Sequence, residues 1–134
     1  MKKKIKDLWV EALRSGKYRQ GKGYLNNNGR YCCLGVLCEL ALKAGVLKEK
    51  FRMMGRTYYY RTGEVSGKEG AAILVPSKVM EWAGLKSASG SVSGKSLVKR
   101  DNNVKFYGLD ALNDDGGAKF DEIADVIEKN WRRL

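Results

Sequence analysis

The sequence predicts an α+β fold, a small single domain in which about four helices surround a short antiparallel sheet or hairpins. A chain of 134 residues is the size of one domain and buries about two-thirds of its unfolded surface on folding. Its hydrophobic content of 43% is enough for a packed core. Helical and alternating apolar patterns both occur, in separate stretches of the chain. We therefore expect one domain over residues 1–134.

Two helices are expected in the first third of the chain. The second covers residues 33–44 and ends at Gly45, and Gly35 inside it predicts close packing by a neighbouring element. The first ends before Gly16, which stands where a C-terminal cap belongs. Its apolar residues at helical spacing are Ile5, Leu8, Trp9, Ala12 and Leu13.

Strand patterns follow each of these helices. Asn28-Gly29 predicts a short hairpin turn, because both residues tolerate positive φ. Residues 51–61 are strand-like, residues 62–64 resemble a turn, and residues 71–74 are expected to pair back. Alternation would place Tyr58 and Tyr60 on one face of that strand and Tyr59 on the other.

The remaining sequence predicts two more helices and a long loop. A short helix over residues 76–85 begins near Pro76 and ends at Gly84. The Ser/Gly/Lys-rich segment 86–103 is expected to be a mobile loop. A solvated turn is expected around the acidic residues of segment 110–115, and the final helix runs from Phe120 to Leu134.

The chain is strongly basic, with 26 Lys and Arg against 15 Asp and Glu, which gives a formal charge of +11. Such a balance favours anionic partners. Cations gather in the first quarter and carboxylates in the last, a distribution that would permit head-to-tail self-association. The alternative is a solvated cationic surface with no specific partner.

Several chemistries are disfavoured by the residues present. The chain has no histidine, which removes His-based general acid–base and nucleophilic catalysis. Cys32, Cys33 and Cys38 lack the paired spacing of a zinc site and are expected to be buried thiols in a reducing cytosol. The Gly-Lys-Ser run at residues 94–96 lacks P-loop spacing. We expect a cytoplasmic protein with no membrane span, enzymatic activity, cofactor or metal.

The most informative segment is the loop 16–31, which alternates cations, tyrosines and glycines. Cations attract an anion, tyrosine rings stack on a base, and glycines let a ligand approach the backbone. A second basic and aromatic patch is expected around residues 56–61. The candidate ligand-binding residues from the two segments are Arg14, Lys17, Tyr18, Arg19, Gln20, Lys22, Tyr24, Arg30, Arg56, Tyr58, Tyr60 and Arg61. Among them, Arg19 and Lys22 are the strongest candidates for ligand contact.

Motifs along most of the chain resemble a family of small phage-encoded proteins. They are W-x-x-A-L-R-S-G-x-Y-x-Q-G from Trp9, Y-C-C-L-G-V-L-C from Tyr31, V-P-x-x-V-x-x-W-x-G-L from Val75, and L-N-D from Leu112 with F-x-x-I-A-D-x-I-E from Phe120. The resemblance implies a phage origin and suggests a role against host defence. It carries no established catalytic residues.

The leading functional expectation is a non-enzymatic protein that binds an anionic, phosphate-bearing small molecule, such as a nucleotide immune signal, and sequesters it. A homo-oligomer is expected, because small pockets of this kind often need a second subunit to close. Two alternatives remain open: a nucleic-acid-binding protein that uses the same basic surface, and a protein–protein inhibitor of an acidic host defence enzyme.

Overall fold

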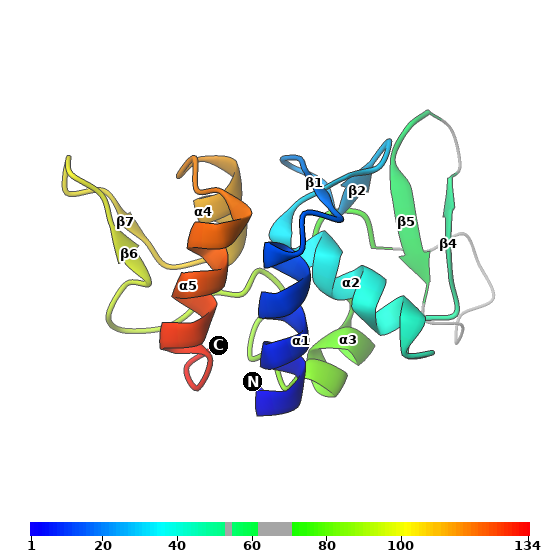
Figure 1. Ribbon diagram of the computed structural model, residues 1–134, viewed down its shortest axis with the longest axis horizontal. Coiled ribbons are helices and arrows are strands. Elements are labelled where there is room, and N and C mark those ends of the chain that lie inside the picture. Colours follow the sequence, from blue (N-terminus) through cyan, green and yellow to red (C-terminus); the bar gives the residue numbers. More distant parts are fainter. Residues whose placement is uncertain (53–54, 62–70) are drawn as a thin grey trace.

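The computed structural model describes residues 1–52, 55–61 and 71–134. These residues form an α+β domain with five helices and short sheets and hairpins (Figure 1). The expected fold class is confirmed, with one helix more than expected. The predicted turn at residues 62–64 lies outside the described residues.

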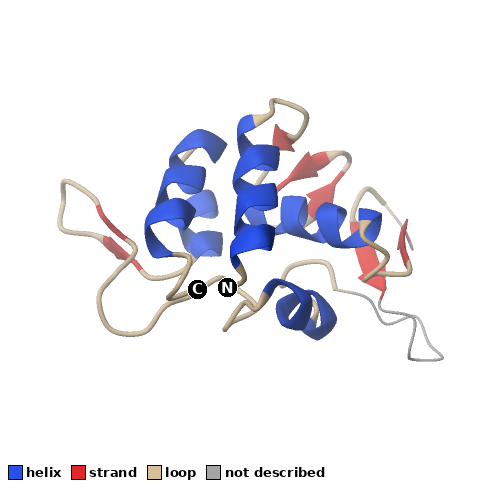
Figure 2. Cartoon of the chain, turned by 60° about the horizontal axis from the view of Figure 1, so that its bottom comes forward, coloured by secondary structure: helices blue, strands red, loops and turns tan. Residues whose placement is uncertain are grey.

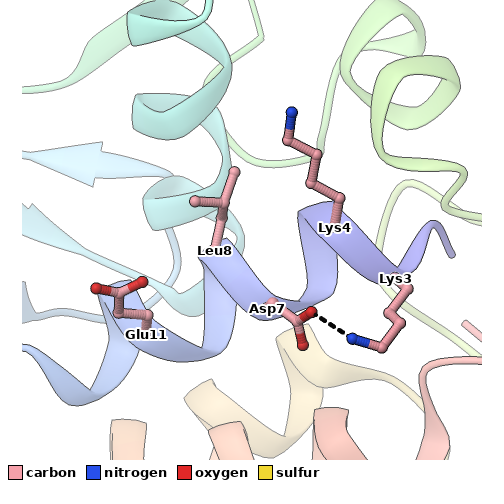
Figure 3. Close-up of a pocket in the computed structure, with 5 residues that line it drawn as sticks. All are labelled: Lys3, Lys4, Asp7, Leu8 and Glu11. Carbon is pink, nitrogen blue, oxygen red and sulfur yellow. Dashed lines mark hydrogen bonds and ion pairs between the residues drawn. The ribbon is translucent and has the colours of Figure 1, made fainter.

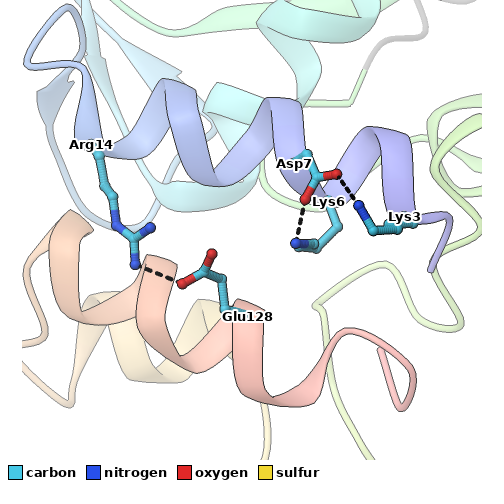
Figure 4. Close-up of polar contacts among 5 residues, drawn as sticks. All are labelled: Lys3, Lys6, Asp7, Arg14 and Glu128. Carbon is cyan, nitrogen blue, oxygen red and sulfur yellow. Dashed lines mark hydrogen bonds and ion pairs between the residues drawn. The ribbon is translucent and has the colours of Figure 1, made fainter.

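Helices α1 (Lys3–Arg14) and α5 (Phe120–Asn130) lie side by side, although they come from opposite ends of the sequence (Figure 2). Arg14 donates a hydrogen bond to Glu128 at 2.9 Å (Figure 4), and it also pairs with Asp125. The N-terminal ammonium donates to the carbonyl of Leu134 at 3.0 Å, so the two chain ends meet. The basic first quarter and the acidic last quarter thus meet within one chain.

Helix α2 (Cys33–Lys43) runs through the core, and most of its residues are buried. It packs against α1, against α3 (Ser77–Ala83) and against α4 (Leu109–Asp114). The Trp9 ring is fully buried, and its indole nitrogen donates to the carbonyl of Cys33 at 2.9 Å. Gly35 faces the backbone of Leu25, whose carbonyl oxygen would lie 1.7 Å from an added Cβ. The close packing expected at Gly35 is confirmed.

A three-stranded sheet precedes α2 in the chain, with strand order β1-β3-β2. β1 (Arg19–Gln20) pairs with β3 (Arg30–Tyr31) in parallel, and β2 (Asn26–Asn27) pairs with β3 in antiparallel. The predicted turn joins β2 to β3, with φ of 54° at Asn28 and 79° at Gly29. Two positive φ values in succession are typical of a type I′ turn, which fixes this hairpin's register. The parallel β1–β3 pair was not expected.

Two further hairpins lie at opposite ends of the long axis (Figure 1). β4 (Glu49–Arg52) and β5 (Tyr58–Arg61) form one, and Tyr60 pairs with Ala71 across an isolated bridge, as the sequence predicted. β6 (Val98–Lys99) and β7 (Lys105–Phe106) form the other. β6 falls within the expected loop 86–103, where Ser87 Oγ also accepts from the amide of Ser91. The mobility of that segment stays a prediction.

The C-terminal third differs from expectation at two places. Residues 109–114, expected as a solvated turn, form α4, because Leu109 and Leu112 are fully buried on its inner side. The last helix ends at Asn130, short of Leu134, and residues 131–133 form a turn. For α4, burial of apolar side chains that the local pattern did not reveal decides the outcome.

Candidate functional site

In the three-stranded sheet, the strand register places two arginines side by side on adjacent strands. Arg19 on β1 is the direct partner of Arg30 on β3, and Arg30 in turn faces Asn27 on β2. Direct partners in a sheet project from the same face. Arg19 and Arg30 are both exposed, whereas their neighbours Gln20 and Tyr31 are half-buried on the other face. One face of this small sheet therefore carries two adjacent guanidinium groups.

The turn before β5 lies beside this sheet and brings a third exposed arginine, Arg56, next to it. Asn27 forms a bridge with Thr57, and the amide of Asn28 donates to the carbonyl of Arg56 at 2.8 Å. Two sequence segments that were predicted as separate patches are therefore in contact at this point. We call Arg19, Arg30 and Arg56 the arginine row.

The arginine row differs from the other arginines of the chain in its side-chain contacts. Over residues 1–52, 55–61 and 71–134, none of its three guanidinium groups has a hydrogen bond, an ion pair or an aromatic ring partner. The other six arginines of the chain all have such a partner: Arg14, Arg52, Arg61, Arg100, Arg132 and Arg133. Like charges that lie abreast repel each other, so this face favours a bound anion.

The opposite face of the sheet is fixed by Asn113, which is fully buried on α4. Its Oδ1 accepts from Gln20 Nε2 at 3.0 Å and from the amide of Cys33 at 3.2 Å. Its Nδ2 donates to the carbonyl of Gly21 at 2.9 Å. One amide side chain thus ties β1, the start of α2 and α4 together, and thereby sets the position of Arg19.

Four predicted site residues have structural roles instead. Arg14 joins α1 to α5, and Gln20 donates to Asn113 and to the carbonyl of Ala118 at 2.8 Å. Tyr60 is 1% exposed, and Arg61 pairs with Glu49 and lies over the Phe51 ring, 4.4 Å from its centroid. These internal contacts compete with a ligand for the same side chains, and their part in a ligand site stays a prediction.

Tyr60 takes part in a buried polar cluster that the sequence did not reveal. Its hydroxyl donates to Glu39 at 2.7 Å, and Lys50 Nζ donates to the same carboxylate oxygen at 2.7 Å. Burial and the charge of Glu39 raise the pKa of Tyr60 far above its ordinary value. Glu39 stands within an otherwise apolar helix, and this isolation was the available signal for a buried ion pair.

Two predicted tyrosines are already covered by cations. Lys43 donates to the Tyr18 hydroxyl at 3.1 Å and lies over that ring, which also meets Tyr31 edge to face. Lys50 and Arg52 both lie over the Tyr58 ring, 5.5 and 5.2 Å from its centroid. Each ring would have to give up a cation–π contact before a base could stack on it.

Three predicted residues remain open on the surface. Lys17, Lys22 and Tyr24 are exposed in the segment around β1, and Tyr24 is 40% exposed. The side chain of Lys17 also lines a hollow of about 190 Å³ together with Tyr18 and Lys43. The amide of Gly23, between Lys22 and Tyr24, donates to Asp114 at 3.0 Å, which holds this loop against α4.

A larger hollow lies elsewhere, along α1. It has a volume of about 480 Å³ and is lined by Lys3, Lys4, Asp7, Leu8 and Glu11 (Figure 3). Asp7 there is paired with Lys3 at 2.9 Å and with Lys6. Cations and carboxylates alternate along this helix face, so it offers no concentrated charge to an anion.

The three cysteines are buried thiols, as expected. Burial raises the pKa of Cys32 to about 11 and raises the pKa values of Cys33 and Cys38 well above their ordinary value. Thiols in such surroundings are poor nucleophiles. No group of three metal-ligating side chains occurs in the part of the chain that the structure describes. Within the same residues, every helix is too short or too polar to cross a membrane.

Fold and site together define a small α+β domain with exposed arginines on the outer face of a sheet, and these arginines have no side-chain partner among the described residues. Residues 1–131 match the model of a family described as a domain of unknown function, DUF8296. The chain belongs to that family. No curated protein and no solved structure matches it.

Proposed function

We propose that this protein binds a phosphate-bearing small molecule of the nucleotide class at the arginine row and retains it without turnover. The observation that carries the proposal is the pair Arg19–Arg30, abreast on one sheet face and without a described partner. Adjacent strands lie about 4.8 Å apart, so both guanidinium groups can converge on one phosphate or on two linked phosphates.

Arginine suits this task because its planar guanidinium donates two parallel hydrogen bonds to phosphate oxygens. Lys17 and Lys22, exposed beside β1, add positive charge to the approach. Tyr24 is the exposed ring in the same segment and is the candidate for stacking on a base. The base contact is thus assigned to Tyr24 rather than to Tyr58 or Tyr60.

Binding of the ligand without a chemical reaction is consistent with the low reactivity of the neighbouring thiols. The thiols closest in sequence, Cys32 and Cys33, are buried with raised pKa values. The resemblance to small phage-encoded proteins suggests that the ligand is a nucleotide signal of a host defence. The protein would sequester this signal in the cytoplasm. A second subunit that covers the open sheet face would close the site, so a homo-oligomer forms part of the proposal.

Calorimetry with a panel of linear and cyclic nucleotides and inorganic phosphate tests the proposal. We expect at least one nucleotide to bind the wild-type protein. Each of Arg19→Gln and Arg30→Gln is expected to weaken that affinity about tenfold or more, because each removes a charge-assisted hydrogen bond. Arg132→Gln is the matched control, since its side chain is exposed and lies on Trp131. Equal losses in all three variants would exclude a specific site.

Native mass spectrometry of protein purified from its producing cells tests retention and assembly together. We expect a retained, phosphate-containing mass on the wild-type protein and none on the Arg19→Gln/Arg30→Gln variant. The same spectra report the oligomeric state. An unliganded wild-type protein that also binds no nucleotide in calorimetry would refute the proposal.

A further inference from the structure

The hairpin of β6 and β7 projects from one end of the molecule as a two-stranded arm. Residues 97–106 form this arm, and Figures 1 and 2 both show it at one end of the molecule, next to α4 and α5. At its base the amide of Leu97 donates to the carbonyl of Phe106 at 2.8 Å, and near its tip the amide of Arg100 donates to the carbonyl of Val104 at 2.8 Å. The arm is thus a paired ribbon along its length.

The two faces of the arm differ in chemistry. Val98 and Phe106 are direct partners and are half-buried, and both pack against the core. Lys99 and Lys105 are also direct partners, and both are exposed. The solvent face of the ribbon therefore sets two ammonium groups side by side.

Like charges directly opposite each other destabilise a hairpin. Neither lysine has a described carboxylate within ion-pair distance. Arg100, between them and the tip, donates instead to the body of the protein, to the carbonyl of Gly116 at 3.0 Å, and pairs with Glu122 at 2.7 Å. The arm is thus anchored by its arginine, while its two lysines are left for an external anion.

The tip of the arm carries side chains that can contact base edges. Asp101, Asn102, Asn103 and Val104 are all exposed, and Val104 is 47% exposed. Amide side chains pair with adenine, a carboxylate accepts from cytosine, and a small apolar side chain contacts the thymine methyl group. The two lysines can therefore contact phosphates, while the amide side chains at the tip contact bases in a groove.

We propose that the arm is a binding element for duplex DNA, with Lys99 and Lys105 on the phosphate backbone and the tip in the major groove. The major groove of B-form DNA admits a two-stranded β-ribbon, whereas the deep, narrow major groove of A-form RNA does not. This site is separate from the arginine row, and its test does not depend on the function proposed for that row.

Fluorescence anisotropy with a mixed-sequence 20-base-pair DNA duplex, measured over a range of salt concentrations, tests the proposal. We expect the wild-type protein to bind, with an affinity that falls steeply as salt rises. Each of Lys99→Ala and Lys105→Ala is expected to reduce the slope of log affinity against log salt by about 0.9, one phosphate contact. The double variant is expected to weaken binding more than tenfold at low salt.

Stability measurements separate loss of contact from loss of fold. Removal of one of two repelling lysines should leave the thermal midpoint unchanged or raise it, while DNA affinity falls. The control double variant Lys48→Ala/Lys129→Ala removes the same charge from exposed positions outside the arm. It is expected to change DNA affinity less than threefold.

Four results would overturn the proposal: no binding of the duplex by the wild-type protein at low salt, equal losses in the arm and control variants, equal affinity for double-stranded RNA, or loss of binding only in Arg19→Gln/Arg30→Gln. The last result would assign nucleic-acid binding to the arginine row instead. A fifth result, an arm variant that loses thermal stability together with DNA binding, would also overturn it, because the loss of binding would then follow from loss of the fold.

Discussion

At the scale of single residues, Gly35 shows most directly how packing constrains this chain. An added Cβ would lie 1.7 Å from the carbonyl oxygen of Leu25 and 2.5 Å from its carbonyl carbon, both in the backbone. Backbone atoms cannot move aside as a flexible side chain can. The loop before β2 therefore reaches α2 only because this position has no side chain.

We predict that Gly35→Ala lowers the free energy of unfolding by about 3 kcal/mol or more, as overpacking against a rigid neighbour does. Helix propensity alone predicts the opposite, a gain of up to about 1 kcal/mol from replacing glycine inside a helix. Urea unfolding of the two proteins decides between them. A variant as stable as the wild type would mean that Leu25 does not lie against α2.

Residue patterns identified candidate cations and tyrosines, but they did not separate exposed side chains from those with internal partners. Arg19 and Arg30 were identified because cations recur in segment 16–31, and the structure places them abreast. Arg14 and Tyr60 fit the same pattern, yet they have internal partners on α5 and α2. The partner of Arg14 lies 111 residues away on α5, and that of Tyr60 lies 21 residues away on α2. A local pattern carries no information about such partners, so sequence alone could not separate the two groups.

At the scale of elements, α4 and its Asn113 organise the sheet that carries the arginine row. Asn113 is fully buried and contacts β1, the residue after it and the first residue of α2. The sequence contained a usable signal, a polar residue directly after the buried Leu112 in an apolar helical pattern. The neighbouring aspartates dominate the local composition, and for this reason the local pattern favours a solvated turn.

We expect Asn113→Ala to lower the free energy of unfolding by about 2–4 kcal/mol, because it leaves several buried polar partners unpaired. It should also weaken ligand binding at the arginine row, since β1 loses the contact that positions Arg19. Asn102→Ala, at the exposed tip of the arm, is the control and should change stability by less than about 0.5 kcal/mol. Equal stability of the two variants in thermal or urea unfolding would contradict this role of Asn113.

Helices were predictable where an apolar stripe runs uninterrupted, as in α1, α2 and α5, and the Asn28-Gly29 turn was predictable from its residues. The parallel pairing of β1 with β3 was not, because each strand has two residues and its partner is chosen by contacts with α4. Short strands carry too little pattern to set their own register.

At the scale of the whole molecule, burial of the thiols makes stability depend on pH. The folded-state pKa of Cys32 is about 11 and those of Cys33 and Cys38 are higher than their ordinary value of 9.0. Because the folded state holds these protons more tightly, its stability is full below about pH 9 and is lost as the pH rises toward the folded-state values.

We predict that the thermal midpoint falls between pH 9 and pH 10.5, with each thiol removing about 1.4 kcal/mol of unfolding free energy per pH unit. Cys38→Ala should reduce this slope, whatever it does to stability at pH 7. The native thiols should also resist iodoacetamide at pH 8 and react in urea. A midpoint that stays constant up to pH 10.5 would contradict the burial of these groups.

The net charge of +11 is distributed so that opposite charges meet where α1 packs on α5, while unpartnered cations remain on the sheet and on the arm. Composition predicted an anionic partner, but only the register of short strands shows which cations are free to meet one. Arg19–Arg30 and Lys99–Lys105 are both direct cross-strand pairs of like charge, at separate places on the surface.

The most direct test of the central claim is a nuclear magnetic resonance titration that follows the arginine side-chain Nε–Hε signals as pyrophosphate is added. We predict that the signals of Arg19 and Arg30 shift together and saturate, while those of Arg14 and Arg61, which are already paired, stay in place. Signals would be assigned from the Arg19→Gln and Arg30→Gln variants. Shifts that are absent, or equal for all arginines, would contradict a phosphate site at the arginine row.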